Sequence, residues 1–290
     1  MEAINRRLMR AHTIVNDCSP FHCDGDYTVG VDLGTADIVT MVVDPSGWPI
    51  ACFLDWASVV KDGVVVDYYN ACKLVRQQLD KVEKKLNISV EVVNTSFPPG
   101  TDARISTNVI ESAGVMIGEV RDEPSSVAEL LNVSAGAVVD IGGGTTGTAI
   151  IKNHTITHSF DEPTGGTHMS LTIAGNRHVS FDEAERLKKS SKNAQLMPIV
   201  KPVIEKFADI ITQHVSDHDI DEIYLTGGTC CFPEIDRVFA EVMDDKNIIL
   251  PDFPLYLTPL AIACSGLSHT SMLQPYADET SSNVGVNGVA

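Results

Sequence analysis

The stretch Val29-Gly-Val-Asp-Leu-Gly-Thr35, followed by the apolar run 38–43, has a second version later in the chain, Val138-Val-Asp-Ile-Gly-Gly-Gly-Thr145. Each stretch predicts a strand, a buried aspartate, a glycine turn and a returning strand. Glycine lets the backbone approach a ligand closely, and successive amides in such a turn suit a phosphate group. A single copy is typical of an ordinary tight hairpin. Two copies, about a hundred residues apart, indicate a duplicated fold with two facing phosphate loops.

The aspartates of the two hairpins, Asp32 and Asp140, are expected to flank one site. Two carboxylates beside a polyphosphate repel it unless a divalent cation lies between them, so the pair predicts Mg²⁺ held largely through water. Phosphate is expected to contact the two turns, which consist of Gly34, Thr35, Gly142, Gly143, Gly144 and Thr145.

The composition narrows the class of protein. The chain has 290 residues, of which 43% are hydrophobic, enough for one large domain or two joined ones. Its formal net charge of −18 argues against a nucleic-acid or anionic-membrane surface. No apolar run reaches the length of a transmembrane helix, and no secretory signal is recognisable, so we expect a cytoplasmic protein. Its 7 cysteines, without a C-x-x-C pair, are typical of reduced thiols.

Strands and helices are expected to alternate through the body of the chain, which predicts an α/β fold. We expect a first lobe in residues 27–135 and 252–267, a second lobe in residues 136–251, and a disordered tail in residues 268–290. Helices are predicted at residues 70–86, 105–113, 122–131, 181–190, 197–215, 233–242 and 259–267.

Residues 1–26 stand apart from this pattern. Ile4, Leu8, Ala11 and Val15 fall on one face of a predicted helix, and residues 16–26 are typical of a linker. An amphipathic helix on a tether often docks on a partner protein. The linker favours a detachable targeting or docking helix, and packing on the body of the same chain is the alternative.

Further motifs make the chain resemble the actin-like ATPase superfamily, which includes actin, the DnaK-type chaperones, MreB and the sugar kinases. The two hairpins resemble its two phosphate motifs, and Asp122-Glu-Pro124 resembles the start of its first connecting segment. The resemblance implies two lobes with ATP or ADP and Mg²⁺ between them. It also implies that Glu123 orients the attacking water, with Asp32 and Asp140 as the other catalytic residues and as the metal site.

Two more segments resemble the adenosine-binding parts of this superfamily. Thr226-Gly-Gly-Thr229 is similar to the adenosine motif, and Ala184-Glu-Arg-Leu-Lys-Lys189 is similar to the helix that embraces the adenosine in the chaperones. The resemblance therefore implies that the adenosine is held by Glu185, Lys188, Gly227, Gly228 and Thr229.

Longer strings are similar to the EutJ family of ethanolamine-utilisation proteins. They include Thr95-Ser-Phe-Pro-Pro-Gly-Thr-Asp102, Gly142-Gly-Gly-Thr-Thr-Gly-Thr148 and Thr164-Gly-Gly-Thr-His168. This resemblance implies a place in ethanolamine catabolism near the bacterial microcompartment. The implied role is that of a chaperone, with ethanolamine ammonia-lyase or the shell proteins as its partners.

The chain also departs from the superfamily pattern. Gly147 stands where the superfamily usually carries an acidic residue or a histidine that positions the metal or the water. We expect the fold to lack the large subdomain insertion that holds the chaperones' catalytic lysine, and to lack a peptide-binding domain. We therefore expect at most a slow ATPase, which a Gly147→Asp substitution should accelerate.

Two other functions remain open at this stage. A metabolite kinase of the same fold would need a catalytic base in the cleft, and Asp37 is the acidic residue available for that role. An activase of a radical enzyme would need a cluster-binding cysteine at a dimer interface, and the adjacent Cys230 and Cys231 are the hint of one.

Overall fold

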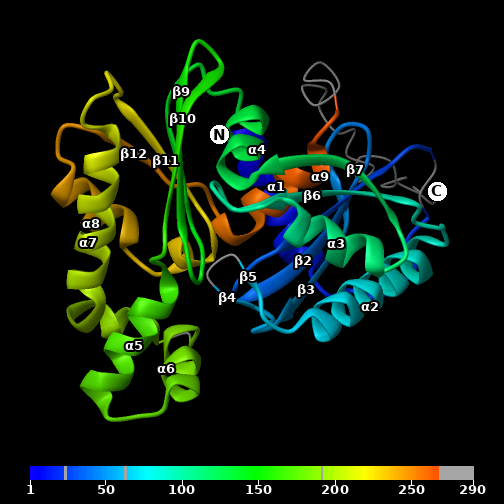
Figure 1. Ribbon diagram of the computed structural model, residues 1–290, viewed down its shortest axis with the longest axis horizontal. Coiled ribbons are helices and arrows are strands. Elements are labelled where there is room, and N and C mark those ends of the chain that lie inside the picture. The colour runs from blue at the N-terminus through cyan, green and yellow to red at the C-terminus, as the bar shows by residue number, and fades with distance from the viewer. Residues whose placement is uncertain (23–24, 62–63, 191, 268–290) are drawn as a thin grey trace, which may run out of the picture.

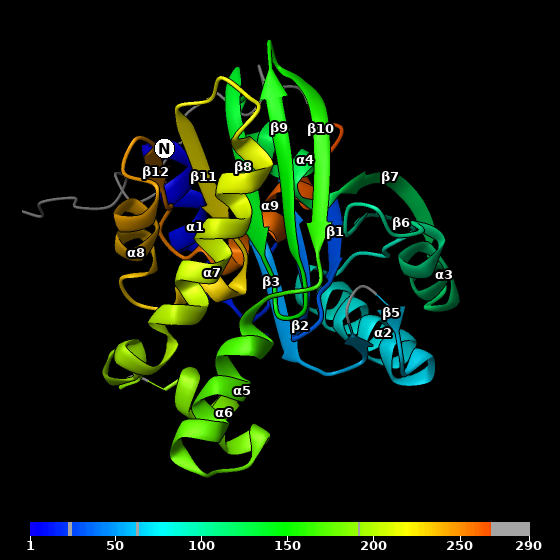
Figure 2. The same cartoon turned by 60° about the vertical axis from the view of Figure 1, so that its left-hand side comes forward.

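The computed structural model describes residues 1–22, 25–61, 64–190 and 192–267 and contains two five-stranded sheets that stand side by side (Figure 1). The tail predicted to be disordered, residues 268–290, lies outside the described residues. Each sheet has helices on its outer face, and further helices fill the space between the two sheets (Figures 1 and 2).

The first sheet has the strand order β3-β2-β1-β6-β7. Strands β1 to β3 are antiparallel neighbours, whereas β6 and β7 run parallel to β1. Helices α2 and α3 cover its outer face with apolar side chains such as Val75 and Leu79. The bounds of these elements are β1 Thr28–Leu33, β2 Asp37–Val43, β3 Pro49–Trp56, β6 Val92–Phe97, β7 Met116–Asp122, α2 Tyr68–Leu86 and α3 Arg104–Ser112.

The second sheet repeats this arrangement in the order β10-β9-β8-β11-β12. Its first three strands are again antiparallel, and its last two again run parallel to the first strand of the hairpin. The duplication that the two hairpins predict is therefore confirmed. The elements of this half are β8 Ala135–Ile141, β9 Thr146–Lys152, β10 Thr155–Glu162, β11 Glu222–Thr226, β12 Asn247–Ile249, α5 Gly166–Arg177, α6 Phe181–Lys188, α7 Met197–Val215 and α8 Ile235–Val242.

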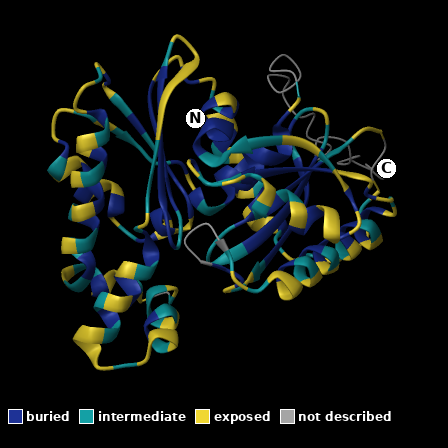
Figure 3. Ribbon diagram, viewed as in Figure 1, coloured by how far each residue is buried: buried dark blue, intermediate teal, exposed yellow. Residues whose placement is uncertain are grey.

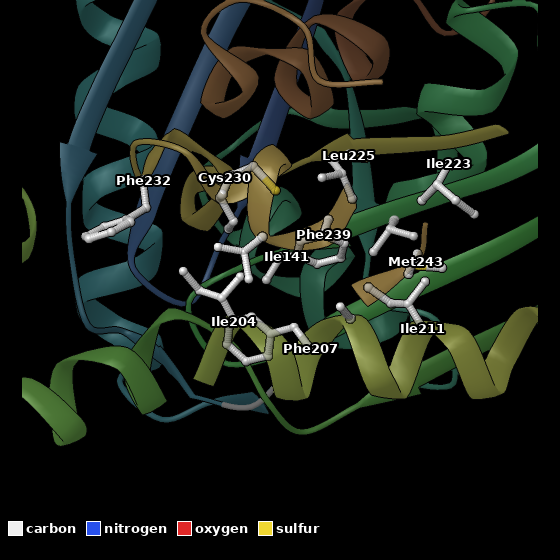
Figure 4. Packing of buried hydrophobic residues seen from close by; sticks show 14 of the residues in the cluster. Ile141, Ile204, Phe207, Ile211, Ile223, Leu225, Cys230, Phe232, Phe239 and Met243 are labelled. Atoms are coloured by element: carbon white, nitrogen blue, oxygen red, sulfur yellow. The ribbon is translucent and has the colours of Figure 1, made fainter. Parts of the chain in front are cut away.

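An apolar core lies under the outer helices of the second sheet. Figure 4 shows Ile141, Leu225 and Phe239 packed against side chains of α7 such as Phe207. Cys230 belongs to the same core and is 1% exposed. The thiol of Cys230 is therefore enclosed in one lobe and is not available at a dimer interface, whereas the neighbouring Cys231 is exposed. The activase hypothesis then depends on Cys231 alone.

A second core joins the two sheets. Helices α4 (Glu123–Leu130) and α9 (Leu257–Cys264) contribute Val127 and Leu260 to it, and α9 is buried along its whole length. A Cβ atom at Gly30 would lie 2.5 Å from the backbone nitrogen of Ala263, so the glycine allows α9 to touch β1. Figure 3 shows these inner elements as buried and the outer faces of the flanking helices as exposed.

Helix α1 (Glu2–Ile14) packs on the body of the chain. Leu8 and Ala11 are completely buried in the core between the sheets. The segment after the helix is also attached, because the side chain of Asn16 makes hydrogen bonds to both the backbone nitrogen and the carbonyl of Leu54 on edge strand β3. Nζ of Lys85, on α2, forms an ion pair with Oδ2 of Asp17 at a distance of 2.9 Å. Of the two possibilities left open above, the structure shows packing on the body, and detachment of the helix to bind a partner stays a prediction.

The sequence did not predict strands β3, β7 and β12. The last helix begins at Leu257 and ends at Cys264, whereas residues 259–267 were expected. In place of the large insertion of the chaperones, the described part of residues 57–67 holds the short strands β4 (Val60–Lys61) and β5 (Val64–Val65).

Candidate functional site

A cavity of about 300 Å³ lies where the turns of the two β-hairpins meet α6 and the loop after β11. Thirteen of the fourteen residues proposed from the sequence line it: Asp32, Gly34, Thr35, Glu123, Asp140, Gly142, Gly143, Thr145, Glu185, Lys188, Gly227, Gly228 and Thr229. Gly144 is the exception, because it is buried in the second turn away from the cavity wall. The structure thus brings together residues from both halves of the chain.

The turn of the second hairpin is fixed by its neighbours. The carbonyl of Gly142 accepts hydrogen bonds from the backbone nitrogen of Gly166 at 3.0 Å and from the hydroxyl of Thr229 at 2.7 Å. The carbonyl of Gly143 accepts one from the backbone nitrogen of Thr167 at 2.8 Å. Because the first turn of α5 binds these carbonyls, the shape of the loop is set before any ligand arrives.

The two turns face each other at contact distance. A Cβ atom at Gly143 would lie 3.0 Å from the Cβ atom of Ala36 in the first turn. The backbone of the loop after β11 comes equally close to the second hairpin, because a Cβ atom at Gly227 would lie 2.4 Å from Oδ1 of Asp140. Gly227 also has a φ of +93°, a conformation that glycine adopts without strain.

Asp140 is buried, Asp32 is half-buried, and each carboxylate has a hydroxyl partner. Ser96 donates a hydrogen bond to Asp32 over 3.3 Å, and Thr258 donates one to Asp140 over 2.5 Å. Burial raises the pKa of Asp32 to about 8, and the charges of Asp140 and Asp37 add to the rise. Burial also raises the pKa of Asp140 to about 6, against the opposing effect of the Thr258 hydroxyl. The site therefore disfavours the ionised form of both carboxyl groups.

Glu123 is the first residue of α4 and lines the same cavity. The side chain of Asp122, one residue earlier, caps the helix by accepting a hydrogen bond from the backbone nitrogen of Ser125 at 3.0 Å. This cap fixes the direction of the first helical turn and so of Glu123. Burial raises the pKa of Glu123 well above its ordinary value, and the charges of Asp140 and Asp32 raise it further.

Glu185 and Lys188 form an ion pair of 2.7 Å on one wall of the cavity. Nζ of Lys188 also donates a hydrogen bond to the carbonyl of Gly166 over 2.8 Å, and Ser170 donates one to Glu185. Desolvation acts to raise the pKa of Glu185, but the charge and hydrogen bonds of its neighbours outweigh it and lower the pKa. The charged form of Glu185 is therefore favoured beside the start of α5, whereas burial lowers the pKa of Lys188 against the opposing effect of Glu185.

The cavity also contains residues that the sequence reasoning did not assign to the site. Trp56, Lys189 and Thr258 are among them, and Lys189 is the last residue of the segment similar to the adenosine-binding helix. Thr258 was missed because the last helix was expected to begin at residue 259. Asp37, considered above as a base, lines the cavity too, and burial raises its pKa to about 6.

Gly147 is the position at which the sequence departs from the superfamily. It lies opposite Asp140 on the neighbouring strand, and a Cβ atom there would lie 3.2 Å from Cδ of Pro99 and 3.6 Å from Cδ of Pro124. These two prolines belong to the first half of the chain, and a Cβ atom at this position would be in tight contact with Pro99 and in ordinary contact with Pro124. Gly147 therefore serves close packing between the halves.

Among the described residues, no group of three or more His, Cys, Asp or Glu side chains is arranged to hold a metal ion directly. A cation at the pair Asp32 and Asp140 would accordingly take most of its ligands from water or from a bound phosphate.

The comparison with known proteins decides the family. Over 261 residues the chain is 49% identical to the ethanolamine utilization protein EutJ of Salmonella typhimurium, and the match covers 90% of this chain and 92% of that protein. This chain belongs to the EutJ family. The EutJ protein of Escherichia coli K12 is 48% identical over 260 residues. The crystal structure of EutJ from Carboxydothermus hydrogenoformans superposes with a TM-score of 0.85 at 41% identity and covers 91% of this chain and 99% of its own.

The wider fold is that of the actin-like ATPases, as the sequence predicts. A family model described as cell division protein FtsA matches residues 137–274 of this EutJ-family chain. MreB5 of Spiroplasma citri, crystallised with ADP, superposes with a TM-score of 0.63 at 16% identity, which shows the fold alone, over 81% of this chain and 94% of its own. Within the part of the chain that the structure describes, no helix is both long and apolar enough to cross a membrane.

Proposed function

We propose that this EutJ-family chain binds ATP or ADP with Mg²⁺ in the cavity between its two sheets and acts as a nucleotide-dependent switch for a partner protein. One observation carries the proposal: two glycine turns, the carboxylates of Asp32 and Asp140, and the Gly227–Thr229 loop converge on a single cavity. A ligand that contacts both halves favours the closed state of the chain. The difference between its affinities for the closed and the open state limits how far it can shift the equilibrium between these two states.

The cavity fits a nucleotide in shape and in chemistry. The turns at Gly34 and Gly143 present backbone without side chains, as close approach of a phosphate requires. The ion pair of Glu185 and Lys188 lies on the wall that we assign to the adenosine, together with Gly227, Gly228 and Thr229. The fold neighbour MreB5 was crystallised with ADP, which supports a nucleotide as the class of ligand.

The pair Asp32 and Asp140 fits a hydrated Mg²⁺. The hydrogen-bond partners of these carboxylates, Ser96 and Thr258, are hydroxyls and do not neutralise charge. A divalent cation would offset the negative charge of the carboxylates and of the phosphates. Glu123, directed into the cavity by the start of α4, is the residue that we assign to holding the attacking water.

The family membership supports a role in ethanolamine utilisation. We propose ethanolamine ammonia-lyase or the shell proteins of the ethanolamine microcompartment as partners, with this chain acting as a chaperone near that compartment. Affinity capture of ethanolamine ammonia-lyase by the purified chain, with and without ATP, tests the partner. Capture that does not depend on nucleotide would contradict the switch.

Calorimetry with ATP, ADP and Mg²⁺ tests the binding site. Gly143→Val should abolish nucleotide binding, because its side chain would collide with Ala36 and fill the space over the second turn. The matched control is Gly175→Ala, since a Cβ atom at Gly175 would meet nothing within 4 Å. Unchanged affinity in the Gly143 variant would contradict the phosphate-loop assignment.

A metabolite kinase is the second candidate function. It is favoured by one observation, namely that Asp37 lines the cavity and that burial raises its pKa to about 6, within the range suited to a catalytic base near neutral pH. ATP turnover measured with ethanolamine, acetate and glycerol separates the two functions, since a kinase should be stimulated by one of them and a switch by none.

A further inference from the structure

Trp56 and Lys189 come from opposite halves of the chain and meet at the cavity. Trp56 is the last residue of β3 in the first sheet, and Lys189 is the C-cap residue directly after α6 in the second half. Nζ of Lys189 lies 3.7 Å from the centre of the Trp56 indole ring. This distance is well inside the range of a cation–π interaction.

We propose that Trp56 and Lys189 form a gate across the mouth of the cavity, and that breaking their contact is part of each entry and exit of the ligand. The inference rests on the proposed function in one respect, that the ligand is a nucleotide. The contact itself is a property of the chain and can be tested without any ligand.

The burial of the two residues places them at the rim of the cavity. Both line it, yet Trp56 is 54% exposed and the side chain of Lys189 is 36% exposed. Asp140, at the bottom of the same cavity, is only 6% exposed. A pair that lines the cavity and is open to solvent lies where the cavity meets the outside.

Trp56 is tied firmly to the first phosphate hairpin. It pairs with Asp37 across β2 and β3, and the backbone nitrogen of the next residue, Ala57, donates a hydrogen bond to the carbonyl of Ala36 over 3.1 Å. The indole ring therefore moves together with the first turn. A change in the distance between the halves is transmitted directly to the ring.

Lys189 directly follows α6, which together with α5 projects from the sheet of the second half. Helices α5 and α6 pack on each other and project below the strands (Figures 1 and 2). Lys189 is held on its own helix by an ion pair of 3.3 Å with Glu185. It also faces the first half, since its positive charge acts to lower the pKa of Asp37, which burial raises overall. The ammonium group of Lys189 therefore contacts Glu185 in its own half of the chain and Trp56 in the other half.

The gate is weak enough to open repeatedly. Both side chains are partly in water, where a cation–π contact is worth a factor of about two to five in an equilibrium or rate. Losing either partner should therefore speed the release of a bound nucleotide by about twofold to fivefold. The double variant should release it no faster than the quicker single variant, because both substitutions remove one shared contact.

The first experiment detects the contact between Trp56 and Lys189 in the absence of nucleotide. In a Trp48→Phe background, Trp56 is the remaining tryptophan of the chain, so its fluorescence can be followed alone. Lys189→Met should increase the quenching of this fluorescence by acrylamide, because the cation no longer covers the ring. Lys201→Met, which removes a lysine of similar exposure from α7, should leave the quenching unchanged.

The second experiment follows release of a fluorescent ADP analogue with Mg²⁺ by stopped flow. Trp56→Ala and Lys189→Met should each speed release, whereas Trp56→Phe, which keeps an aromatic face, should restore most of the slow rate. Unchanged quenching together with unchanged release rates in a protein that binds the analogue would overturn the gate alone. A wild-type chain that binds neither ATP nor ADP would overturn the proposed function and, with it, the role of the gate.

Discussion

The hydroxyl of Thr258 donates a hydrogen bond to Oδ2 of Asp140 over 2.5 Å and so links helix α9 to the second phosphate hairpin. Thr258 is 3% exposed, and its oxygen also lies 3.2 Å from that of Thr226 on β11. A hydrogen bond to the ionised form of a carboxylate stabilises that form. The start of α9 therefore helps to keep Asp140 ionisable in a site where burial opposes its charge.

Thr258→Val should weaken Mg²⁺-dependent nucleotide binding, because removing the hydroxyl raises the pKa of Asp140 further. Hydrogen bonds to charged groups contribute about 1.5–3 kcal/mol, so we expect at least a tenfold loss of affinity near pH 6 and a smaller loss at pH 8. Calorimetric titrations at both pH values measure it. Thr226→Val removes the neighbouring hydroxyl that does not bond Asp140 and is the control. An equal loss at the two pH values would refute the argument.

The stability of the ligand-free chain should fall as the pH rises. Burial raises the pKa of Asp32 from 3.8 to about 8, so the folded state binds more protons than the unfolded state between these values. Protonated Asp32 therefore makes its full contribution to the free energy of unfolding below pH ~4. This contribution is lost progressively as the pH rises towards ~8.

Asp32→Asn removes this titration and should raise the melting temperature at pH 8 by at least about 2 °C, with little effect at pH 5. Thermal melts across this pH range, followed by circular dichroism, provide the measurement. The control is Asp209→Asn, which neutralises an exposed carboxylate of α7. Parallel pH profiles for wild type and Asp32→Asn would show that Asp32 is not the group responsible.

Helix α1 should contribute to stability through its buried face. Leu8 is 0% exposed, and its replacement by alanine should cost about 2–5 kcal/mol. Met9, on the same helix, is 49% exposed, and Met9→Ala should change stability by less than about 0.5 kcal/mol. Chemical denaturation of both variants and of a chain lacking residues 1–19 tests this. A truncated chain of unchanged stability that no longer associates with its partner would restore the idea of a docking helix.

ATP hydrolysis should be slow, below about 1 s⁻¹. The lysines that line the cavity, Lys188 and Lys189, both lie at the end of α6, and each missing stabilising group costs a factor of about 10²–10³ in rate. The structure reverses the expectation for Gly147→Asp, because a Cβ atom at this position would already be in tight contact with Pro99. That variant should hydrolyse ATP no faster and should melt at a lower temperature. Faster phosphate release with unchanged stability would show that the aspartate can be accommodated.

Local patterns predicted the parts of the site that are continuous in the chain. The two hairpins were recognised because strand, glycine turn and strand follow one another, and the helix cap at Asp122 lies next to Glu123. Strand β7 was missed because much of it is exposed at the edge of its sheet, which leaves no apolar run to recognise. Strand β3 has an apolar run but lacks the glycine motif that drew attention to β1 and β8.

The sequence by itself determined the duplication, the phosphate-loop candidates and the family, since these depend on residue type and on spacing along the chain. Only the tertiary structure decided which distant groups support the site. Thr258 reaches Asp140, Lys189 covers Trp56 and Pro99 fills the space beside Gly147, although each pair is far apart in sequence. It also decided that α1 is part of the body. An amphipathic face shows only that a helix must bury one side, whereas the surface that covers it is formed when the rest of the chain has folded.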